Sequence, residues 1–323
     1  MPVSYPEYIP PFIFRNGHIS TIYSALARKV RGVVYQRQRI ELPDGDFLDL
    51  DWSLAKASNR ILALVLHGLE GDSHRPYVLG AVKKLNVHGF DALAVNFRGC
   101  SGEPNQLFRG YHGGNTEDLS AVIDAAKAKG YRKMVLIGFS LGGNILLKYL
   151  GTSGMSDHQV VGGIAISTPC ALRASLEQLN LPINFVYRQK FLRQLSRKLA
   201  VKFRQFPEAF PNKLPKIYSL LDFDNFYTGP AHGFKDAFDY YEKCSSIQFL
   251  KHIQKPVLIL NAQNDSFLKD KCYPVAAAQT NPYIHLSMPK YGGHVGFYQA
   301  SEFYFHENEM IAFLHKITSD IDL

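Results

Sequence analysis

The chain has 323 residues, of which 46% are hydrophobic and 20% are charged, and its formal net charge at pH 7 is +8. This composition excludes a long disordered region and a fibrous repeat, and the length allows one large domain with an insertion or two ordinary domains. No nucleic-acid recognition motif accompanies the positive charge, so we expect no nucleic-acid partner and at most a weak contact with a membrane surface.

Targeting and cysteine patterns predict a cytoplasmic protein. The apolar runs fall far short of the roughly 20 residues that cross a bilayer as a helix, so no transmembrane segment is predicted. The N-terminal sequence MPVSYPEYIPPFIFRNGH lacks the basic start and the long apolar core of a secretory signal peptide. The four cysteines form neither a C-x-x-C pair nor a zinc-ligand spacing with histidine, which predicts reduced thiols and no metal site.

The first predicted elements are two strands joined by a turn. Residues 33–42 and 47–52 have strand-like patterns and flank the turn-forming Pro43-Asp44-Gly45-Asp46. We expect this hairpin to form the antiparallel edge of a sheet.

Six continuous apolar runs follow, which is typical of strands buried on both faces of a parallel sheet. These runs are residues 61–66, 92–95, 134–137, 160–166, 257–260 and 284–288. Helical patterns separate several of them, and a last helix, with Ser301 as its cap, is expected to pack across the sheet. The predicted helices are residues 76–87, 116–129, 141–150 and 301–317. This alternation predicts an α/β fold with a mostly parallel central sheet flanked by helices.

Residues 171–241 interrupt the alternation, because they contain no strong strand pattern and are rich in Phe, Tyr, Arg and Lys. We interpret them as a helical lid inserted into an α/β core that comprises residues 1–170 and 242–323. The aromatic face of the lid would turn toward a binding cleft. For its basic side chains, a solvated helix surface is the simpler alternative. These basic residues are Arg188, Lys190, Arg193, Arg197, Lys198, Lys202 and Arg204.

A G-x-S-x-G motif lies between a predicted strand and a predicted helix. Gly138-Phe139-Ser140-Leu141-Gly142 directly follows residues 134–137 and opens the helix 141–150. This context is that of a nucleophile elbow, a tight and strained turn in which glycines leave room for the crossing chain segments. Ser140 is therefore the candidate nucleophile.

A serine needs a base to remove its proton, and the base needs a carboxylate to orient it. Asp265 and His294 follow Ser140 in the expected chain order, and each comes shortly after a predicted strand. Parallel strands place their carboxyl ends at one edge of the sheet, where the serine also emerges. The nearest rival acid, Asp270, is expected to lie in the following helix and to face away.

Acyl transfer develops negative charge on a carbonyl oxygen, and this oxyanion requires N–H donors. The backbone amides of Leu69 and Leu141 occupy the two positions that usually supply them. His67 and Asp72 also fit an H-x4-D acyltransferase pattern. We interpret this match as coincidence, because the loop of His67 already has the oxyanion role.

Several segments together resemble the YheT-like (AB hydrolase 4 type) branch of the α/β-hydrolase superfamily, and the likeness runs through nearly the whole chain. They read FRNGH at 14–18, HGLEG at 67–71, NFRGCSG at 96–102, GFSLGGN at 138–144 and GGHVGF at 292–297. The resemblance implies the α/β-hydrolase fold. Asn264-Asp265-Ser266 stands where the group usually shows Asp-Asp-Pro, which favours Asp265 as the acid. We expect no N-terminal membrane anchor like that of the eukaryotic members, so the resemblance implies a protein similar to the bacterial soluble members.

These residues predict a serine hydrolase that cleaves small-molecule carboxylic esters of short to medium acyl chain through an acyl-enzyme, with no metal or organic cofactor. One alternative is an acyltransferase that passes the same acyl group to an alcohol. Another is a non-catalytic small-molecule binding protein on the same fold. A dehalogenase would carry aspartate in place of Ser140. The sequence leaves the oligomeric state open.

Overall fold

The computed structural model describes residues 2–211 and 214–319, so the ends of the predicted core (residues 1 and 320–323) and residues 212–213 of the predicted lid lie outside the described residues. Nine strands form one sheet in the described chain. They are β1 (Val3–Ser4), β2 (Gln36–Glu41), β3 (Phe47–Ser53), β4 (Ile61–Leu66), β5 (Asp91–Asn96), β6 (Lys133–Phe139), β7 (Val160–Ile166), β8 (Val257–Leu260) and β9 (Ile284–Ser287).

The strand order across the sheet is β1-β9-β8-β7-β6-β4-β5-β3-β2. From β1 to β5 in this order all neighbours are parallel, whereas β3 and β2 add the predicted antiparallel edge. All six aliphatic residues of β4 are buried, because helices cover both faces of the sheet. The sequence does not predict β1, since a strand of two residues is too short to show a periodic pattern. β1 pairs with β9 and thereby brings the N-terminal segment to the far edge of the sheet.

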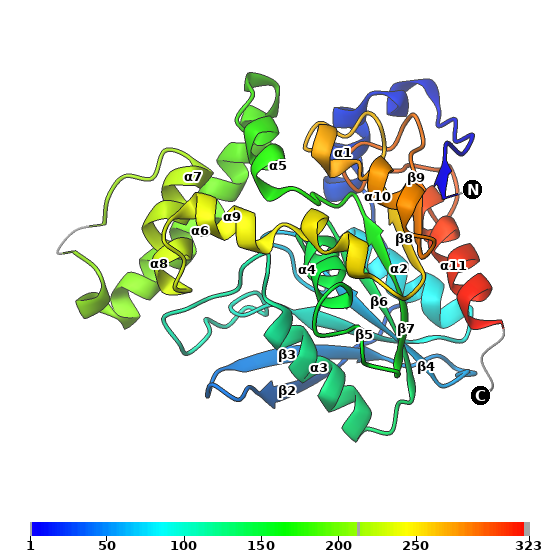
Figure 1. Ribbon diagram of the computed structural model, residues 1–323, viewed down its shortest axis with the longest axis horizontal. Coiled ribbons are helices and arrows are strands. Elements are labelled where there is room, and N and C mark those ends of the chain that lie inside the picture. The colour runs from blue at the N-terminus through cyan, green and yellow to red at the C-terminus, as the bar shows by residue number, and fades with distance from the viewer. Residues whose placement is uncertain (1, 212–213, 320–323) are drawn as a thin grey trace.

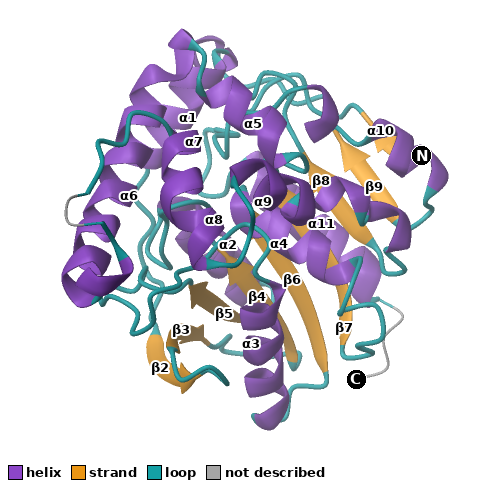
Figure 2. Cartoon of the chain, turned by 60° about the vertical axis from the view of Figure 1, so that its left-hand side comes forward, coloured by secondary structure: helices purple, strands orange, loops and turns teal. Residues whose placement is uncertain are grey.

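Helices lie on both faces of the sheet (Figures 1 and 2). The core helices are α1 (Gly17–Leu26), α2 (Pro76–Val87), α3 (Thr116–Ala128), α4 (Leu141–Leu150), α10 (Val275–Thr280) and α11 (Phe305–Thr318). α2 and α11 bury apolar side chains against one face, and α1 packs on α2. α3, α4 and α10 pack on the other face. The sheet is therefore the middle layer of three.

Five further helices lie between β7 and β8 in the chain. They are α5 (Leu172–Leu179), α6 (Phe185–Gln205), α7 (Leu220–Phe223), α8 (Gly229–Ala231) and α9 (Ala237–Cys244). Most of this group lies to one side of the sheet, at the left of Figure 1. Its apolar side chains form a cluster of their own, which meets the core at Leu141 and Phe267.

The last helix begins later than predicted. The sequence places its cap at Ser301, but α11 begins at Phe305. The carboxylate of Glu307 accepts a hydrogen bond of 2.8 Å from the backbone N–H of Tyr304, and this contact fixes the helix start. The hydroxyl of Ser301 instead donates to the carbonyl of Phe303 in the preceding loop.

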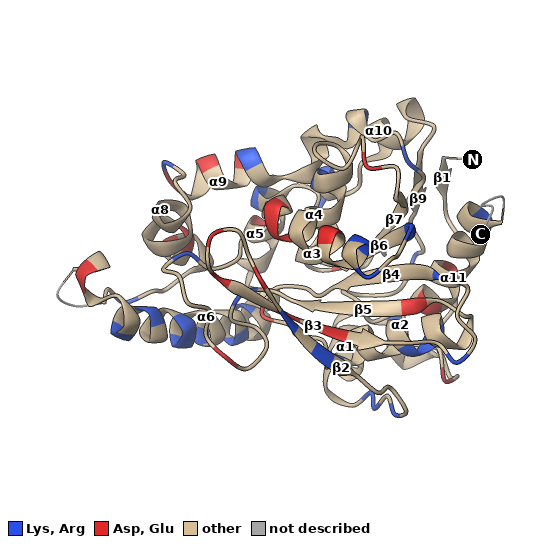
Figure 3. Ribbon diagram, turned by 90° about the horizontal axis from the view of Figure 1, so that it is seen from below, with Lys and Arg blue, Asp and Glu red and all other residues tan. Residues whose placement is uncertain are grey.

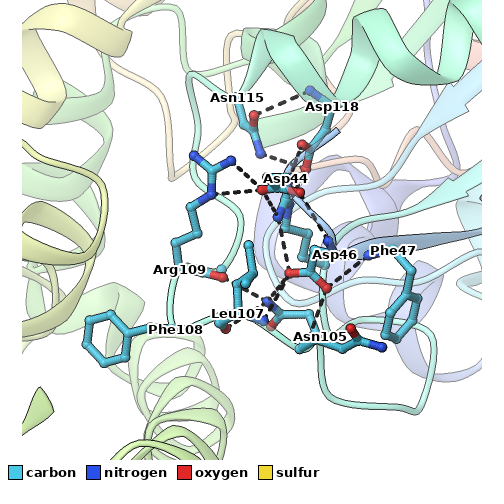
Figure 4. A network of polar contacts seen from close by, with 12 residues as sticks. Asp44, Asp46, Phe47, Asn105, Leu107, Phe108, Arg109, Asn115 and Asp118 are labelled. Carbon is cyan, nitrogen blue, oxygen red and sulfur yellow. Dashed lines mark hydrogen bonds and ion pairs between the residues drawn. The ribbon is translucent and has the colours of Figure 1, made fainter. Parts of the chain in front are cut away.

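A buried ion network ties the turn of the β2–β3 hairpin to the core. The side chain of Arg98 is 3% exposed and donates to both carboxylate oxygens of Asp118, at 2.8 and 2.6 Å. It also lies 2.7 Å from Asp44 and 3.1 Å from Asp46, the two acids of the turn. Figure 4 shows these three carboxylates converging, with Arg109 beside Asp44. One guanidinium thus neutralises carboxylates from two separate segments.

We expect Arg98→Met to lower the free energy of unfolding by about 3–5 kcal/mol, because it leaves buried carboxylates without their cation. Arg109→Met is the matched control. The side chain of Arg109 is 40% exposed and contacts only Asp44 among the carboxylates described, so its loss should cost less than about 1 kcal/mol. Urea unfolding at neutral pH measures both variants, and equal losses would contradict the assigned role of Arg98.

The stability gap between wild type and Arg98→Met should depend on pH. Burial raises the pKa of Asp44, but hydrogen bonds from Arg98 and Arg109 outweigh it and hold the pKa at about 2, below the ordinary 3.8. A carboxylate with a depressed folded pKa stabilises the fold fully above its unfolded pKa, and this contribution is lost as the pH falls through the folded pKa. The gap should therefore be constant above pH 3.8 and narrow toward about pH 2. A gap that does not narrow on acidification would argue against the ion network.

Candidate active site

Ser140 lies in a strained turn between β6 and α4. Its backbone has φ 52° and ψ −116°, a conformation that side chains other than glycine rarely adopt. The turn requires glycines on both sides, since a Cβ at Gly138 would lie 2.5 Å from the backbone of Gly142. A Cβ at Gly142 would lie 2.6 Å from the carbonyl oxygens of Leu66 and His67. The G-x-S-x-G spacing is therefore a packing requirement of this turn.

Three sequence-predicted residues form one chain of hydrogen bonds. Oγ of Ser140 lies 3.0 Å from Nε2 of His294, and Nδ1 of His294 lies 2.8 Å from Oδ2 of Asp265. The Asp265 side chain is fully buried and also accepts a bond of 2.9 Å from the backbone N–H of Phe267. Because a carboxylate only accepts, Nδ1 carries the imidazole proton and the lone pair of Nε2 faces the Ser140 hydroxyl. The histidine is thus in the tautomer that a general base requires.

The loop that carries His294 is held by side chains from three distant segments. Oγ1 of Thr21, in α1, accepts from the backbone N–H of His294 at 2.8 Å. Asn264 accepts from the N–H of the preceding residue, and Ser167 accepts from the N–H of the following residue, each at 2.9 Å. Sequence reasoning missed these supports, because none of them belongs to the motif around His294.

Aromatic contacts connect His294 to α6 and α1. The ring of Phe267 stacks on His294 with centroids 4.2 Å apart, and Tyr187 packs edge-on against Phe267 at 4.8 Å. The hydroxyl of Tyr187 lies 3.2 Å from Nδ1 of His18. Gly17 of the FRNGH segment lies close to the histidine loop, since a Cβ at Gly293 would lie 2.3 Å from the carbonyl oxygen of Gly17. This segment, noted in the sequence only for its family resemblance, therefore contacts both the histidine loop and the inserted helices. The FRNGH motif was the one feature of the sequence that could have indicated this contact.

The two candidate oxyanion donors lie at the same cavity as the serine. The backbone N–H groups of Leu69 and Leu141 have no hydrogen-bond partner within residues 2–211 and 214–319. Both residues line the cavity together with Ser140. A 3.0 Å bond from the N–H of Gly71 to the carbonyl of Gly68 closes the turn that holds Leu69. Both amides are thus candidate donors for an oxyanion in this cavity.

His67 and Asp72 do not form a pair. His67 is fully buried, and burial lowers its pKa to about 3. Its Nδ1 lies 2.7 Å from the carbonyl of Gly68, and its Nε2 accepts from the N–H of Phe97 at 3.1 Å. The carboxylate of Asp72 instead pairs with Arg75 at 3.2 Å. His67 is therefore a neutral residue that supports the loop of Leu69.

Asp270 is separate from the histidine. It begins a single short 3₁₀ turn, η7 (Asp270–Cys272), rather than a longer helix. Its side chain is 76% exposed and lies 3.9 Å from Lys269. Asp265 is thus the carboxylate that contacts His294.

A cavity of about 290 Å³ lies over Ser140. Its walls come from the core loops and from α5, α6, α7 and α9, and they are mostly apolar. Residues 171–241 line the cavity with both leucines and aromatic side chains, among them Phe191, Phe223 and Tyr240, so the predicted aromatic face is mixed with aliphatic residues. The apolar lining residues include Leu172, Leu176, Leu179, Phe191, Leu195, Val201, Leu220, Phe223 and Phe267.

Two lysines of α6 face this cavity rather than solvent. Lys198 forms an ion pair of 2.8 Å with the buried carboxylate of Glu70. Nζ of Lys202 donates to the carbonyls of Asn105 and Leu107, at 2.8 and 2.5 Å, and has no carboxylate at ion-pair distance in the described chain. Burial lowers the pKa of Lys202 to about 8. The interpretation as a solvated surface is wrong for these two residues. It holds for Arg193, Arg197 and Arg204, which are exposed.

Two features are absent from the described residues. No three or more His, Cys, Asp or Glu side chains are grouped so that they could hold a metal ion. No helix there combines the length and the apolar character needed to cross a bilayer.

Comparison with known proteins decides the family. Residues 63–300 match the family model described as the α/β-hydrolase fold. The YheT protein of Escherichia coli is 36% identical over 297 residues, which cover 90% of this chain and 87% of that protein. The chain belongs to the α/β-hydrolase family. A mouse α/β hydrolase relative, named phospholipase ABHD3, is 32% identical over 82% of this chain and 67% of its own length. A Saccharomyces cerevisiae relative named monoacylglycerol lipase is 32% identical over 74% of this chain and 55% of its own length.

Solved structures confirm the fold predicted for this α/β hydrolase. The Pyrococcus furiosus esterase Pf2001 has a TM-score of 0.58 at 17% identity, covering 90% of this chain and 97% of that one. Est1E from Butyrivibrio proteoclasticus, with bound ferulic acid, has a TM-score of 0.57 at 18% identity, covering 88% of this chain and 100% of that one. At these identities the likeness concerns the fold alone. Family membership makes the protein a hydrolase.

Proposed function

We propose that this α/β hydrolase cleaves carboxylic esters of small molecules through an acyl-enzyme formed on Ser140. The observation that carries the proposal is the hydrogen-bond chain from Ser140 through His294 to Asp265, which ends at an apolar cavity. Relatives whose names are phospholipase and monoacylglycerol lipase support ester chemistry. No metal or organic cofactor takes part in the proposed reaction.

The proposed reaction has two steps. Nε2 of His294 takes the proton of Ser140 as Oγ attacks the ester carbonyl carbon, and Asp265 stabilises the resulting imidazolium. The amides of Leu69 and Leu141 stabilise the oxyanion until the alcohol leaves with the proton from His294. Water then attacks the acyl-serine by the same route and releases the acid. The pre-set Nδ1–H tautomer of His294 supports this role, because no reorientation is needed before proton transfer.

Residues 171–241 act, in this proposal, as a lid over the core of residues 1–170 and 242–323. The leucine-rich walls contributed by α5, α6 and α7 favour an acyl chain in the cavity. A cavity of about 290 Å³ suits a chain of short to medium length.

Fluorophosphonate labelling with competition by p-nitrophenyl esters of graded chain length tests the function. We expect covalent labelling of one serine, and competition that is strongest at a short or medium acyl chain. Turnover with added ethanol then distinguishes hydrolysis from acyl transfer, since a transferase would form the ethyl ester in place of the acid. A folded protein that neither labels nor turns over esters would instead be a binding protein on this fold.

The cavity also predicts a preference for an acyl chain with an anionic end. The ammonium of Lys202 is one helical turn beyond Lys198 and has no carboxylate partner among the described residues. The enzyme should therefore prefer the p-nitrophenyl hemiester of a dicarboxylic acid to the neutral ester of equal length. Lys202→Met should lower kcat/KM for the hemiester by about tenfold or more and leave the neutral ester unchanged. Arg197→Met, on the exposed side of α6, is the matched control.

Kinetics on the two esters separate the outcomes of this test. Equal loss on both esters would indicate that Lys202 only ties α6 to the loop of Asn105. If the wild-type enzyme shows no preference for the hemiester, the predicted preference for an anionic end is wrong. The proposal of an esterase is not affected by that result.

A further inference from the structure

Large apolar side chains are exposed on two segments that meet beside the active site. One comprises η1 (Phe12–Arg15) and the start of α1, and the other comprises η2 (Pro182–Asn184) and the first turn of α6. Both lie at the top of Figure 1, and the stacked rings of His18 and Tyr187 join them. We call this surface the apolar face. Its members are Phe12 (84% exposed), Ile13 (57%), Ile19 (38%), Ile183 (65%), Phe185 (52%) and Val186 (68%).

The same two stretches of chain carry only positive charge. Residues 12–19 and 182–193 contain four Lys or Arg and no Asp or Glu. Figure 3 shows Lys and Arg on successive turns of α6. Arg15, Lys190 and Arg193 are exposed, and none of the three pairs with a carboxylate in the part of the chain that the structure describes. The apolar face is thus bordered by unneutralised cations.

We propose that the apolar face docks on the surface of an anionic lipid bilayer. Soluble proteins rarely expose a contiguous apolar patch without a binding role. Apolar side chains bordered by Lys and Arg match a protein that lies in the interfacial region, with its apolar groups among the acyl chains and its cations at anionic headgroups. The absence of acidic residues from both stretches removes the repulsion that such a surface would otherwise produce.

Docking in this way would place the bilayer next to the cavity. Tyr187, directly after Val186 of the apolar face, packs on Phe267, which lines the cavity and stacks on His294. The other half of the face leads into α1, whose Thr21 binds the backbone of the histidine loop. The inference is independent of the proposed ester chemistry, because its test measures binding and not turnover.

Co-sedimentation with lipid vesicles tests the docking surface. The full chain should bind vesicles that contain phosphatidylglycerol more tightly than vesicles of phosphatidylcholine alone, and high salt should weaken the binding. The combined variant Phe12→Ser, Ile13→Ser, Ile183→Ser and Val186→Ser should lower the partition coefficient by about tenfold or more. These side chains are largely exposed, so thermal unfolding and turnover of a water-soluble ester should remain unchanged. Lys190→Gln with Arg193→Gln should weaken the binding and reduce its salt dependence.

The double variant Leu54→Ser and Val87→Ser is the matched control, since these side chains are 56% and 64% exposed outside the apolar face. The control should bind vesicles as tightly as wild type. Failure of the wild type to bind anionic vesicles, or an equal loss in the control, would overturn the proposal. A dimer that the combined variant abolishes, in the absence of vesicle binding, would assign the face to a second copy and would also overturn it.

Discussion

Ser140→Ala should lower kcat/KM for p-nitrophenyl esters by about 10⁶-fold and abolish fluorophosphonate labelling, because among the described residues no other hydroxyl that lines the cavity is hydrogen-bonded to a histidine. The nucleophile forms and breaks a covalent bond in both steps of the proposed mechanism, so its removal leaves only the binding and oxyanion contributions. Residual turnover should therefore have no burst phase. The loss should appear in kcat, since the apolar walls that bind the acyl chain remain.

Ser175→Ala is the matched control for this experiment. Ser175 also lines the cavity and is 7% exposed, but its hydroxyl contacts no histidine. The control should keep its labelling and most of its activity. Thermal unfolding should show that Ser140→Ala is folded, because alanine keeps the strained φ of 52° and removes only one hydrogen bond. Labelling that persists in Ser140→Ala would place the nucleophile elsewhere.

Local sequence patterns were sufficient for most of the sheet. Each of the six apolar runs coincides with a strand, because a parallel strand covered on both faces must be apolar at every position. The hairpin was predicted for a similar reason, since Pro43-Asp44-Gly45-Asp46 has few conformations other than a turn. β1 could not be predicted, because it owes its existence to the exposed edge of β9 and not to its own two residues.

The candidate site was predictable to the extent that its residues sit on strand ends. Ser140, Asp265 and His294 each follow a parallel strand, so the topology alone brings them to one edge of the sheet. The bonds from Thr21 and Ser167 to the histidine loop depend on how side chains pack across segments more than 100 residues apart. No periodicity or local motif contains that information.

The inserted helices show a different limit of sequence reasoning. The 3.6-residue period of α6 predicts which residues share a face, but it does not predict whether a lysine on that face is solvated or buried. Lys198 faces inward because Glu70 provides a buried carboxylate, and Lys202 because two carbonyl groups accept its protons. These partners come from core loops that precede the two lysines by more than 90 residues.

Asp265→Asn should lower kcat by about 10⁴-fold with little change in KM. The amide oxygen must face the backbone N–H of Phe267, which donates to Oδ1 at 2.9 Å, so the amide NH₂ group is left facing Nδ1 of His294. A donor at that position forces Nδ1 to accept and moves the imidazole proton to Nε2. Nε2–H then points at Ser140 and cannot remove its proton. The cavity lining does not include Asp265, so substrate binding should be unaffected.

Asp270→Asn distinguishes this tautomer effect from a general loss of negative charge near the histidine. The substitution Asp270→Asn removes the same charge from the same loop. The side chain of Asp270, however, is 76% exposed and contacts Lys269 instead of His294. The kcat of Asp270→Asn should therefore stay within a few-fold of the wild-type value, since an exposed charge is screened by solvent. Steady-state kinetics of both variants on one p-nitrophenyl ester decide whether Asp265 or Asp270 is the acid that orients His294. Similar losses of kcat in the two variants would mean that the electrostatic field of the loop carboxylates matters more than the hydrogen bond to Nδ1 of His294. A loss confined to Asp270→Asn would mean that Asp270, and not Asp265, is the acid.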